Sequence, residues 1–285
     1  MSACFGPGGN SEAFKVAGFK STVDAPAWLK SVGLDAYEYE AGNGLAANPS
    51  TLALIGKRAA EFGIKMSYHT PYFISLSGVV EEKRLKSLDY IRESLEASRL
   101  LGATTIVVHC GSAAKISRDE AMRLAGDTLA RIPHSMDTYG IRVGIETMGK
   151  VNQLGTLDEV LELCRIDPIF VPVVDFGHLN ARDLGGVFNN ADDYLRVFDK
   201  IDRAMGKSTI DSLHCHFSKI EWTGSGEKKH LTFEDEVFGP SFEPFVEAIA
   251  RAGISPTVIC ESAGTQSGDA LLMKRYYNSI VGGVK

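Results

Sequence analysis

The feature that most constrains this chain is the alternation of short apolar runs with longer amphipathic stretches from one end to the other. Most of the apolar runs are short and rich in Val and Ile, which is typical of parallel strands covered on both faces. The eight predicted strands are Ala3–Phe5, Ala36–Tyr39, Lys65–His69, Thr105–His109, Arg142–Glu146, Phe170–Asp175, Leu213–Phe217 and Thr257–Glu261. This pattern predicts repeated βα units.

Amphipathic stretches with helical spacing occupy the intervals between these strands. The predicted helices are Ser50–Phe62, Glu81–Leu101, Arg118–Tyr139, Leu157–Cys164, Ala191–Met205, Ser241–Ala252 and Gly268–Ile280. Eight strand and helix repeats predict an α/β fold, a (β/α)8 TIM barrel, whose usual length is about 250 residues. A doubly wound parallel sheet is the alternative. Neither a linker nor a change of composition divides the chain, so we expect a single domain over residues 1–285.

Composition limits the class of protein and its partners. The 285 residues are 44% apolar and 23% charged, which excludes a disordered, collagen-like or disulfide-dense chain. The formal charge of -6 means that a polyanionic partner would need a local basic patch. No apolar run approaches the roughly 18 residues of a membrane span, and no targeting segment is recognisable. Five cysteines without a CxxC pair argue against a disulfide framework and a Cys-based zinc site. We expect a cytoplasmic protein.

Five predicted strands end in residues that can bind metals. His69, His109 and Glu146 end three of them, and Asp175 and Glu261 end two more. In a parallel barrel the carboxyl ends of all strands converge on one mouth, where the active sites of this fold lie. These side chains are therefore expected to meet in one pocket.

Further histidines lie near the same strand ends. His178 follows Asp175 by three residues, and His230 lies in the long loop after the seventh strand. His214 and His216 face one side of that strand because side chains alternate along it. His216 lies nearer the mouth and is the better candidate ligand.

A cluster of carboxylates and imidazoles would be costly to desolvate without a compensating cation. The mixture of nitrogen and oxygen donors suits Zn²⁺, with Mn²⁺ or Fe²⁺ as alternatives, and it argues against Ca²⁺. The candidates outnumber the ligands that one ion can use, so we expect two to three ions with a bridging carboxylate. Clusters of this kind usually catalyse displacement at phosphorus, which predicts phosphoester hydrolysis.

Six short segments carry a resemblance to a known family. They are His69-Thr-Pro-Tyr72, Val108-His-Cys-Gly111, Gly144-Ile-Glu-Thr147, Asp175-Phe-Gly-His-Leu-Asn180, His216-Phe-Ser218 and Cys260-Glu-Ser262. In this order, from about residue 64 to residue 262, the chain resembles the endonuclease IV family of apurinic/apyrimidinic endonucleases. The resemblance implies a (β/α)8 barrel with three zinc ions. It also implies cleavage of double-stranded DNA on the 5′ side of an abasic site, leaving a 3′-hydroxyl and a 5′-deoxyribose phosphate.

The same resemblance implies ligands for two of the three ions. His69 and His109 would hold one ion, and Glu146 would bridge it to a second. The remaining ligands of the second ion would be Asp175, His216 and Glu261. Glu146 and Glu261 would be catalytic, and His214 would orient a ligand from behind through its other nitrogen.

The third ion would be held by His178 and His230. The family also supplies an aspartate two residues before the last histidine, but Lys228 occupies that position here. The nearest carboxylate is Glu227. Either the loop shifts so that Glu227 reaches the ion, or the third site is weak. We favour Glu227 because two glycines give this loop freedom to reposition.

Candidate DNA contacts surround the predicted mouth. By resemblance, Tyr72 belongs to a loop that enters the minor groove, where an aromatic wedge could unstack the duplex. The other candidates are Trp222 in the long loop and the basic residues Lys150, Arg182, Lys219, Lys228 and Lys229. The segment after the second strand carries no basic residue, so the expected DNA affinity is modest. We expect the protein to act as a monomer.

Sugar isomerases and epimerases with the same barrel are the competing interpretation. Their single divalent ion is held by a Glu, Asp, His, Glu set that here would be Glu146, Asp175, His216 and Glu261. Proton transfer beside a carbonyl would then be the reaction. The additional strand-end histidines argue against it, because a one-ion isomerase would not need them. A non-enzymatic metal-binding or carbohydrate-binding barrel is a third interpretation, disfavoured because the site leaves room for metal-bound water.

Overall fold

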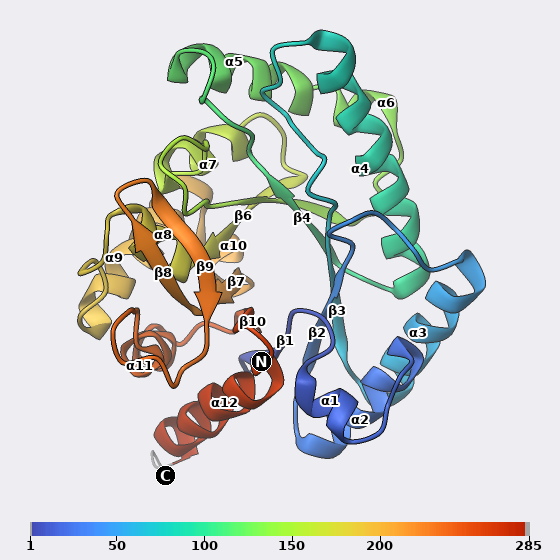
Figure 1. The fold of residues 1–285 in the computed structure, drawn as a ribbon, viewed down its shortest axis with the longest axis vertical. Coiled ribbons are helices and arrows are strands. Elements are labelled where there is room, and N and C mark those ends of the chain that lie inside the picture. Colours follow the sequence, from blue (N-terminus) through green and yellow to red (C-terminus); the bar gives the residue numbers. More distant parts are fainter. Residues whose placement is uncertain (1, 283–285) are drawn as a thin grey trace.

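Eight parallel strands form a nearly closed barrel, which confirms the predicted (β/α)8 class (Figure 1). A computed structural model describes residues 2–282. Around the barrel the order is β1, β10, β7, β6, β5, β4, β3, β2. Their bounds are β1 Cys4–Pro7, β2 Ala36–Glu40, β3 Lys65–His69, β4 Thr105–His109, β5 Arg142–Glu146, β6 Phe170–Asp175, β7 His214–Phe217 and β10 Thr257–Cys260. Every predicted strand is present, with ends that differ by at most two residues.

The barrel closes where β1 meets β2. The amide of Gly9 donates a hydrogen bond to the carbonyl of Glu38 at 3.0 Å, which links the two strands. The approach is close, because a Cβ placed on Gly6 would lie 1.8 Å from the carbonyl oxygen of Ala36. Glycine at position 6 therefore allows closure. Closure in turn brings the side chains of β2 into the interior opposite β7.

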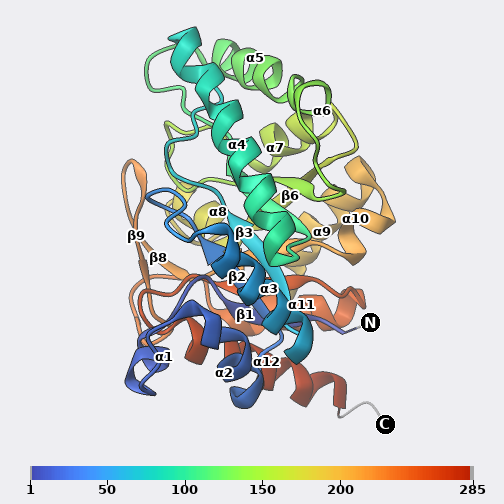
Figure 2. The ribbon, with the colours of Figure 1, turned by 90° about the vertical axis from the view of Figure 1, so that its right-hand side faces the viewer.

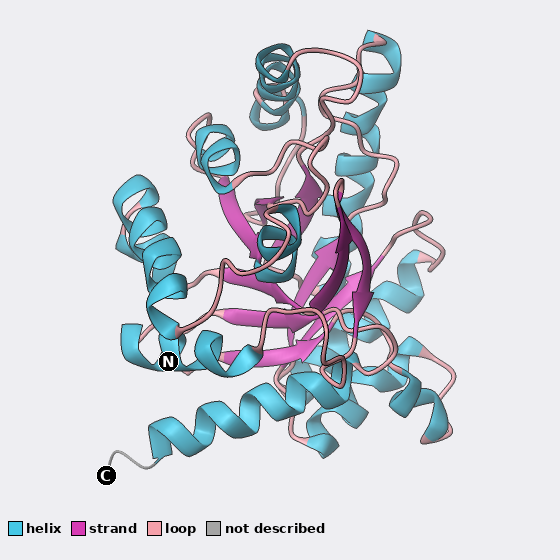
Figure 3. Ribbon diagram, turned by 60° about the vertical axis from the view of Figure 1, so that its left-hand side comes forward, coloured by secondary structure: helices cyan, strands magenta, loops and turns pink. Residues whose placement is uncertain are grey.

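Helices surround the strands (Figure 3). They are α1 Glu12–Val16, α2 Ala25–Val32, α3 Pro49–Phe62, α4 Glu81–Leu101, α5 Arg118–Leu129, α6 Ile132–Ser135, α7 Leu157–Cys164, α8 Phe176–Arg182, α9 Ala191–Met205, α10 Lys207–Asp211, α11 Phe242–Ala252 and α12 Gln266–Gly282. The predicted single helix Arg118–Tyr139 is wrong, because α5 ends at Leu129 and α6 follows it. Pro133, in the first turn of α6, has no amide hydrogen with which to continue the earlier helix.

The segment predicted as a long loop after the seventh strand is an antiparallel hairpin. Strands β8, Lys219–Thr223, and β9, Gly226–Leu231, pair across a turn at positions 224–225. Figure 2 shows the hairpin projecting from one side of the barrel, away from both chain ends. Trp222 and His230 therefore lie on strands rather than in a flexible loop. Within residues 2–282, none of the helices has the length and apolarity needed to cross a membrane.

Candidate metal centre

A cavity of about 870 Å³ lies at the carboxyl ends of the barrel strands. Charged and titratable side chains dominate its wall. Those predicted from the sequence that line it are His69, Tyr72, His109, Glu146, Lys150, His178, Glu227, His230 and Glu261. Asp175 and His216 lie deeper and are fully buried. The candidate ligands thus converge, as the strand order predicted.

The first cluster joins β3, β4 and β5. The Nε2 atoms of His69 and His109 lie 3.4 and 3.2 Å from Oε2 of Glu146. Nδ1 of His69 lies 3.0 Å from the carbonyl oxygen of Thr70, so the ring proton belongs on Nδ1 and the Nε2 lone pair faces the cluster. Oε2 of Glu146 is buried without a hydrogen-bond partner among the described residues. A divalent cation fits this arrangement of two nitrogen donors and an unpaired carboxylate oxygen.

The second cluster uses the other oxygen of Glu146. Oε1 of Glu146 lies 3.0 Å from Nδ1 of His216, and Oε1 of Glu261 lies 3.3 Å from the same nitrogen. Asp175 completes the group, in which all four ligand atoms lie within 4.8 Å of one another. Within the described chain, Oδ2 of Asp175 is also buried without a hydrogen-bond partner. One imidazole and three carboxylates can hold one divalent ion, and Glu146 connects this cluster to the first.

The third cluster lies under the hairpin. Nε2 of His178, from α8, lies 3.5 Å from Oε2 of Glu227, and His230 completes the group. Nδ1 of His178 lies 3.0 Å from the carbonyl of Thr147, which directs Nε2 toward the cavity. Nδ1 of His230 lies 2.8 Å from the hydroxyl oxygen of Ser218. Two imidazoles and one carboxylate are therefore available to a third ion.

A β-bulge explains why Glu227, and not Lys228, faces this cluster. Across the hairpin, Glu227 pairs with Trp222 while Lys229 pairs with Glu221, so Lys228 is an extra residue. An extra residue shifts the alternation of side chains and can redirect one of them. Glu227 is fixed by its amide, which donates to the carbonyl of Gly149 at 3.0 Å. The structure thus brings Glu227 beside His178, whereas Lys228 points outward to Glu221 at 2.6 Å.

Burial and mutual repulsion shift the pKa values of the carboxylates. Burial raises the pKa of Glu146, but His216 and the neighbouring histidines outweigh it and hold the pKa well below its usual range. Burial raises the pKa of Glu261 well above its usual range, despite the opposing effect of His216. Burial also raises the pKa of Glu40 to about 7, and the charge of Glu38 adds to this. Several carboxyl groups therefore crowd this cavity, and a bound cation would favour their ionised forms.

The histidines respond to the same field. Burial lowers the pKa of His69, yet the facing carboxylates of Glu40 and Glu146 raise it to about 10. Burial dominates at His109 and His230, whose pKa values fall below the usual range. Because a metal binds only neutral imidazole, protons on His69 would compete with a cation.

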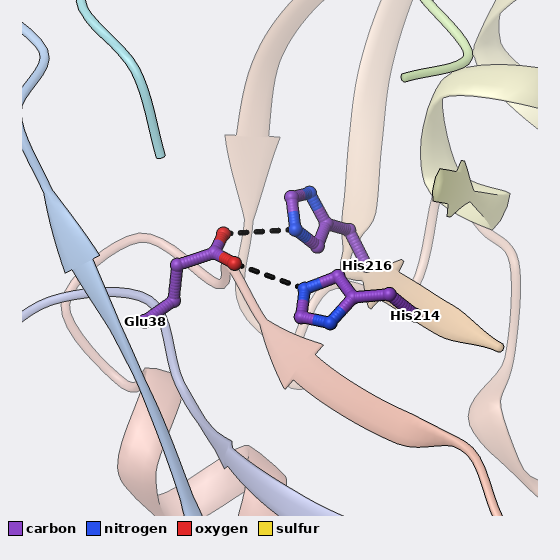
Figure 4. A group of neighbouring side chains, drawn as sticks. All are labelled: Glu38, His214 and His216. Carbon is purple, nitrogen blue, oxygen red and sulfur yellow. Dashed lines mark hydrogen bonds and ion pairs between the residues drawn. The ribbon is translucent and has the colours of Figure 1, made fainter. Parts of the chain in front are cut away.

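Two carboxylates of β2 were missed in the sequence. Glu38 is fully buried, and Glu40 lines the cavity. Strand β2 reads Ala-Tyr-Glu-Tyr-Glu, and its alternation places both carboxylates on the interior face. This two-residue spacing was a usable signal. Nε2 of His214 lies 2.9 Å from Oε2 of Glu38 (Figure 4). His214 therefore contacts Glu38, which in turn lies beside the predicted ligand His216.

Several candidate DNA contacts are engaged within the protein. The guanidinium of Arg182 donates to four backbone carbonyls in the segment 148–153. Nζ of Lys219 donates to the carbonyls of Phe233, at 3.0 Å, and of Asp235. The ring of Trp222 packs edge-on against Phe238, with centroids 4.6 Å apart. These three side chains therefore hold neighbouring loops through contacts within the protein.

The other candidate contacts are accessible. Tyr72 is 62% exposed at the mouth, with its ring centroid 6.0 Å from those of His69 and His109. Lys150 is exposed on the cavity wall. Nζ of Lys229 lies 3.3 Å from the carboxylate that also pairs with Lys228, at the outer face of the hairpin. Tyr72 and Lys150 thus lie at the cavity, whereas Lys228 and Lys229 lie on the hairpin and pair with Glu221.

The fold and the clustered ligands define a TIM barrel with a candidate metal centre at its mouth. The chain belongs to the xylose isomerase-like TIM barrel family, whose profile matches residues 26–275.

Relatives and solved structures point to more than one activity within this family. An uncharacterized protein of Methanocaldococcus jannaschii is 31% identical over 79% of this chain and 81% of its own length. A probable endonuclease 4 of Acholeplasma laidlawii is 29% identical over 60% of this chain and 59% of its own length.

Two solved structures share the fold. Endonuclease IV from Thermus thermophilus superposes with a TM-score of 0.64 and 19% identity over 92% of this chain and 95% of its own. A D-tagatose 3-epimerase-like protein superposes with a TM-score of 0.69 and 20% identity over 88% of this chain and 91% of its own. At these identities the two structures establish the fold alone.

Proposed function

We propose that this protein is a DNA repair endonuclease of the endonuclease IV type. It hydrolyses the phosphodiester on the 5′ side of an abasic site in double-stranded DNA, leaving a 3′-hydroxyl and a 5′-deoxyribose phosphate. The observation that carries this proposal is the presence of three ligand clusters in one cavity, two of them sharing Glu146. Each cluster combines imidazole nitrogen with carboxylate oxygen, which suits Zn²⁺, with Mn²⁺ or Fe²⁺ as alternatives. The relative named probable endonuclease 4 supports it.

Glu146 and Glu261 have the central roles in this proposal. Bound zinc supplies Lewis acidity for displacement at phosphorus. Glu146 holds the two neighbouring sites at a fixed separation, because its oxygens face different clusters. Glu261 is 16% exposed on the cavity wall and can exchange a proton with a group bound there. Hydrolysis requires an acceptor for the proton of the attacking water. Glu261 can accept it only in its ionised form, which a neighbouring cation would favour against the raised pKa of this group.

The exposed mouth provides the DNA contacts. Tyr72 can insert beside the abasic nucleotide, which costs least to extrude because it lacks a base. Lys150, Lys228 and Lys229 can contact backbone phosphates, so binding should weaken steeply with salt.

A duplex oligonucleotide with one tetrahydrofuran abasic mimic tests the proposal. Zinc-loaded protein should incise it once, on the 5′ side of the lesion, and Glu146→Gln should abolish incision because the bridging carboxylate is lost. His134→Gln is the control, since His134 is exposed on α6 outside the centre. An intact duplex after incubation with micromolar zinc-loaded protein would contradict the proposal.

A metal-dependent sugar isomerase or epimerase is the second candidate. It is favoured by Glu40 in the cavity wall and by the absence of basic residues from positions 40–48. The second cluster alone would hold its single ion, and its carboxylates would move the proton. Metal analysis separates the candidates, because two to three zinc ions per chain favour the nuclease and one Mn²⁺ or Mg²⁺ favours the isomerase.

A further inference from the structure

Below the second cluster, a carboxylate from β2 reaches across the barrel to two histidines of β7. Oε1 of Glu38 lies 2.9 Å from Nε2 of His216, and Oε2 lies 2.9 Å from Nε2 of His214. Figure 4 shows one carboxylate oxygen facing each ring. The three side chains are 0%, 0% and 4% exposed, so water does not compete for these contacts.

The two nitrogens of His216 face different partners. Nε2 faces Glu38, whereas Nδ1 faces Glu146 at 3.0 Å and Glu261 at 3.3 Å. A neutral imidazole has one proton and one lone pair, and an ionised carboxylate only accepts. Nδ1 is hydrogen-bonded to Glu146, and Nε2 lies close to Glu38 without a hydrogen bond among the described residues. A metal ion on Nδ1 would take the lone pair there, and the ring proton would then lie on Nε2, where Glu38 can accept it.

His214 fixes the orientation of Glu38. Its Nε2 donates to Oε2, the carboxylate oxygen that His216 does not face. Without this donor, Oε2 would be a buried charged atom with no partner, which is costly. Rotation of the carboxylate would break this hydrogen bond and the 2.9 Å contact of Oε1 with His216.

A metal site made of Glu38, His214 and His216 would need a lone pair on Nε2 of His216. A neutral imidazole has a single lone pair. In the proposed centre that lone pair lies on Nδ1, so a further ion here would compete with the second cluster for His216.

We propose that Glu38 is a positioning residue that fixes the tautomer and ring orientation of His216, so that Nδ1 is presented to the second metal, and that His214 holds Glu38 in place. This inference rests on the metal centre of the proposed function. Partners of this kind, behind a ligating histidine, typically change metal affinity by 10- to 100-fold when they are replaced.

Glu38→Gln tests this role with little change of shape. The amide has one acceptor oxygen and cannot accept from both histidines. The zinc affinity of the second site should fall by roughly 10- to 100-fold in chelator competition, while the other two sites keep theirs. Asp193→Asn is the matched control, because Asp193 is a buried carboxylate that caps α9 far from the centre. It should lower thermal stability and leave zinc affinity unchanged.

A second measurement uses the wild-type protein and does not depend on a variant folding. In zinc-loaded protein with ¹⁵N-labelled histidine, long-range ¹H–¹⁵N spectra should show the proton of His216 on Nε2. A proton on Nδ1 would overturn the inference, as would a Glu38→Gln protein that melts earlier yet binds every ion as tightly as wild type. Both readouts are independent of DNA. Wild-type protein that incises abasic DNA but shows either result would refute the role of Glu38 and leave the proposed function intact.

Discussion

The β-bulge at Lys228 leads to a prediction about Glu227. The third metal site should depend on the carboxylate of Glu227 and not on the number of residues between it and His230. Deletion of Lys228 converts Gly-Glu-Lys-Lys-His into Gly-Glu-Lys-His. Residues two apart on a regular strand share a face. The deletion therefore removes the bulge but keeps Glu227 on the same face as His230. Replacement by Gln at position 227 leaves the bulge and removes the charge.

The expected loss for Glu227→Gln can be worked from its surroundings. The carboxylate is 13% exposed and lies 3.5 Å from His178, so it is only partly screened. A pair of unit charges 4 Å apart at an effective permittivity of 20 interacts by about 4 kcal/mol. Solvent screening and the desolvation of the carboxylate offset part of this, leaving about 2–3 kcal/mol. At 1.4 kcal/mol per tenfold change, the third ion should bind roughly 30- to 150-fold more weakly.

Metal content after dialysis against a weak chelator is the assay. Wild-type protein and the Lys228 deletion should retain three zinc ions per chain, whereas Glu227→Gln should retain two. Glu236→Gln, an exposed carboxylate beyond the hairpin, is the control and should retain three. Three ions in Glu227→Gln would refute Glu227 as a ligand. Two ions in the deletion variant, with the hairpin still folded, would show that alternation alone does not restore the site.

Three further predictions concern pH, DNA binding and barrel closure. In metal-free protein the pKa of His69 is raised to about 10, so the folded state binds more protons than the unfolded state above about pH 6.5. Denaturant titrations should therefore show the free energy of unfolding falling between about pH 6.5 and pH 10. A rise over this range would contradict the assigned charges. Lys150→Gln should weaken binding to abasic duplex and reduce the salt slope by about 0.9, whereas Glu40→Gln should strengthen binding severalfold; equal affinities would remove both residues from the DNA surface. Gly6→Ala should lower the free energy of unfolding by about 3 kcal/mol or more, because the new Cβ would overlap the Ala36 carbonyl; a neutral change in urea unfolding would show that β1 and β2 can separate freely.

The strand ends were predictable because parallel strands place their carboxyl ends on one rim, whatever the loops do. The sequence alone therefore predicted that His69, His109 and Glu146 lie close together. The alternation along β2 could have placed Glu38 on the interior face. Its contact with His214 and His216 could not be predicted, because it depends on β2 closing the ring opposite β7. The bulge was also hidden, since a shift in alternation is defined by the partner strand and not by the residues of one strand alone.

The shared carboxylate of Glu146 is the strongest structural argument for more than one ion. An isomerase with one ion would use only Oε1 of Glu146, the oxygen that faces His216 in the second cluster. On the other side, Oε2 faces two imidazole nitrogens from β3 and β4 and is buried without a hydrogen bond among the described residues. A buried carboxylate oxygen without a hydrogen bond is destabilising unless a positive charge faces it. Protonated His69 supplies that charge in the metal-free protein. A second ion would supply it once the imidazoles are neutral, and a one-ion mechanism assigns no such role to His69 and His109.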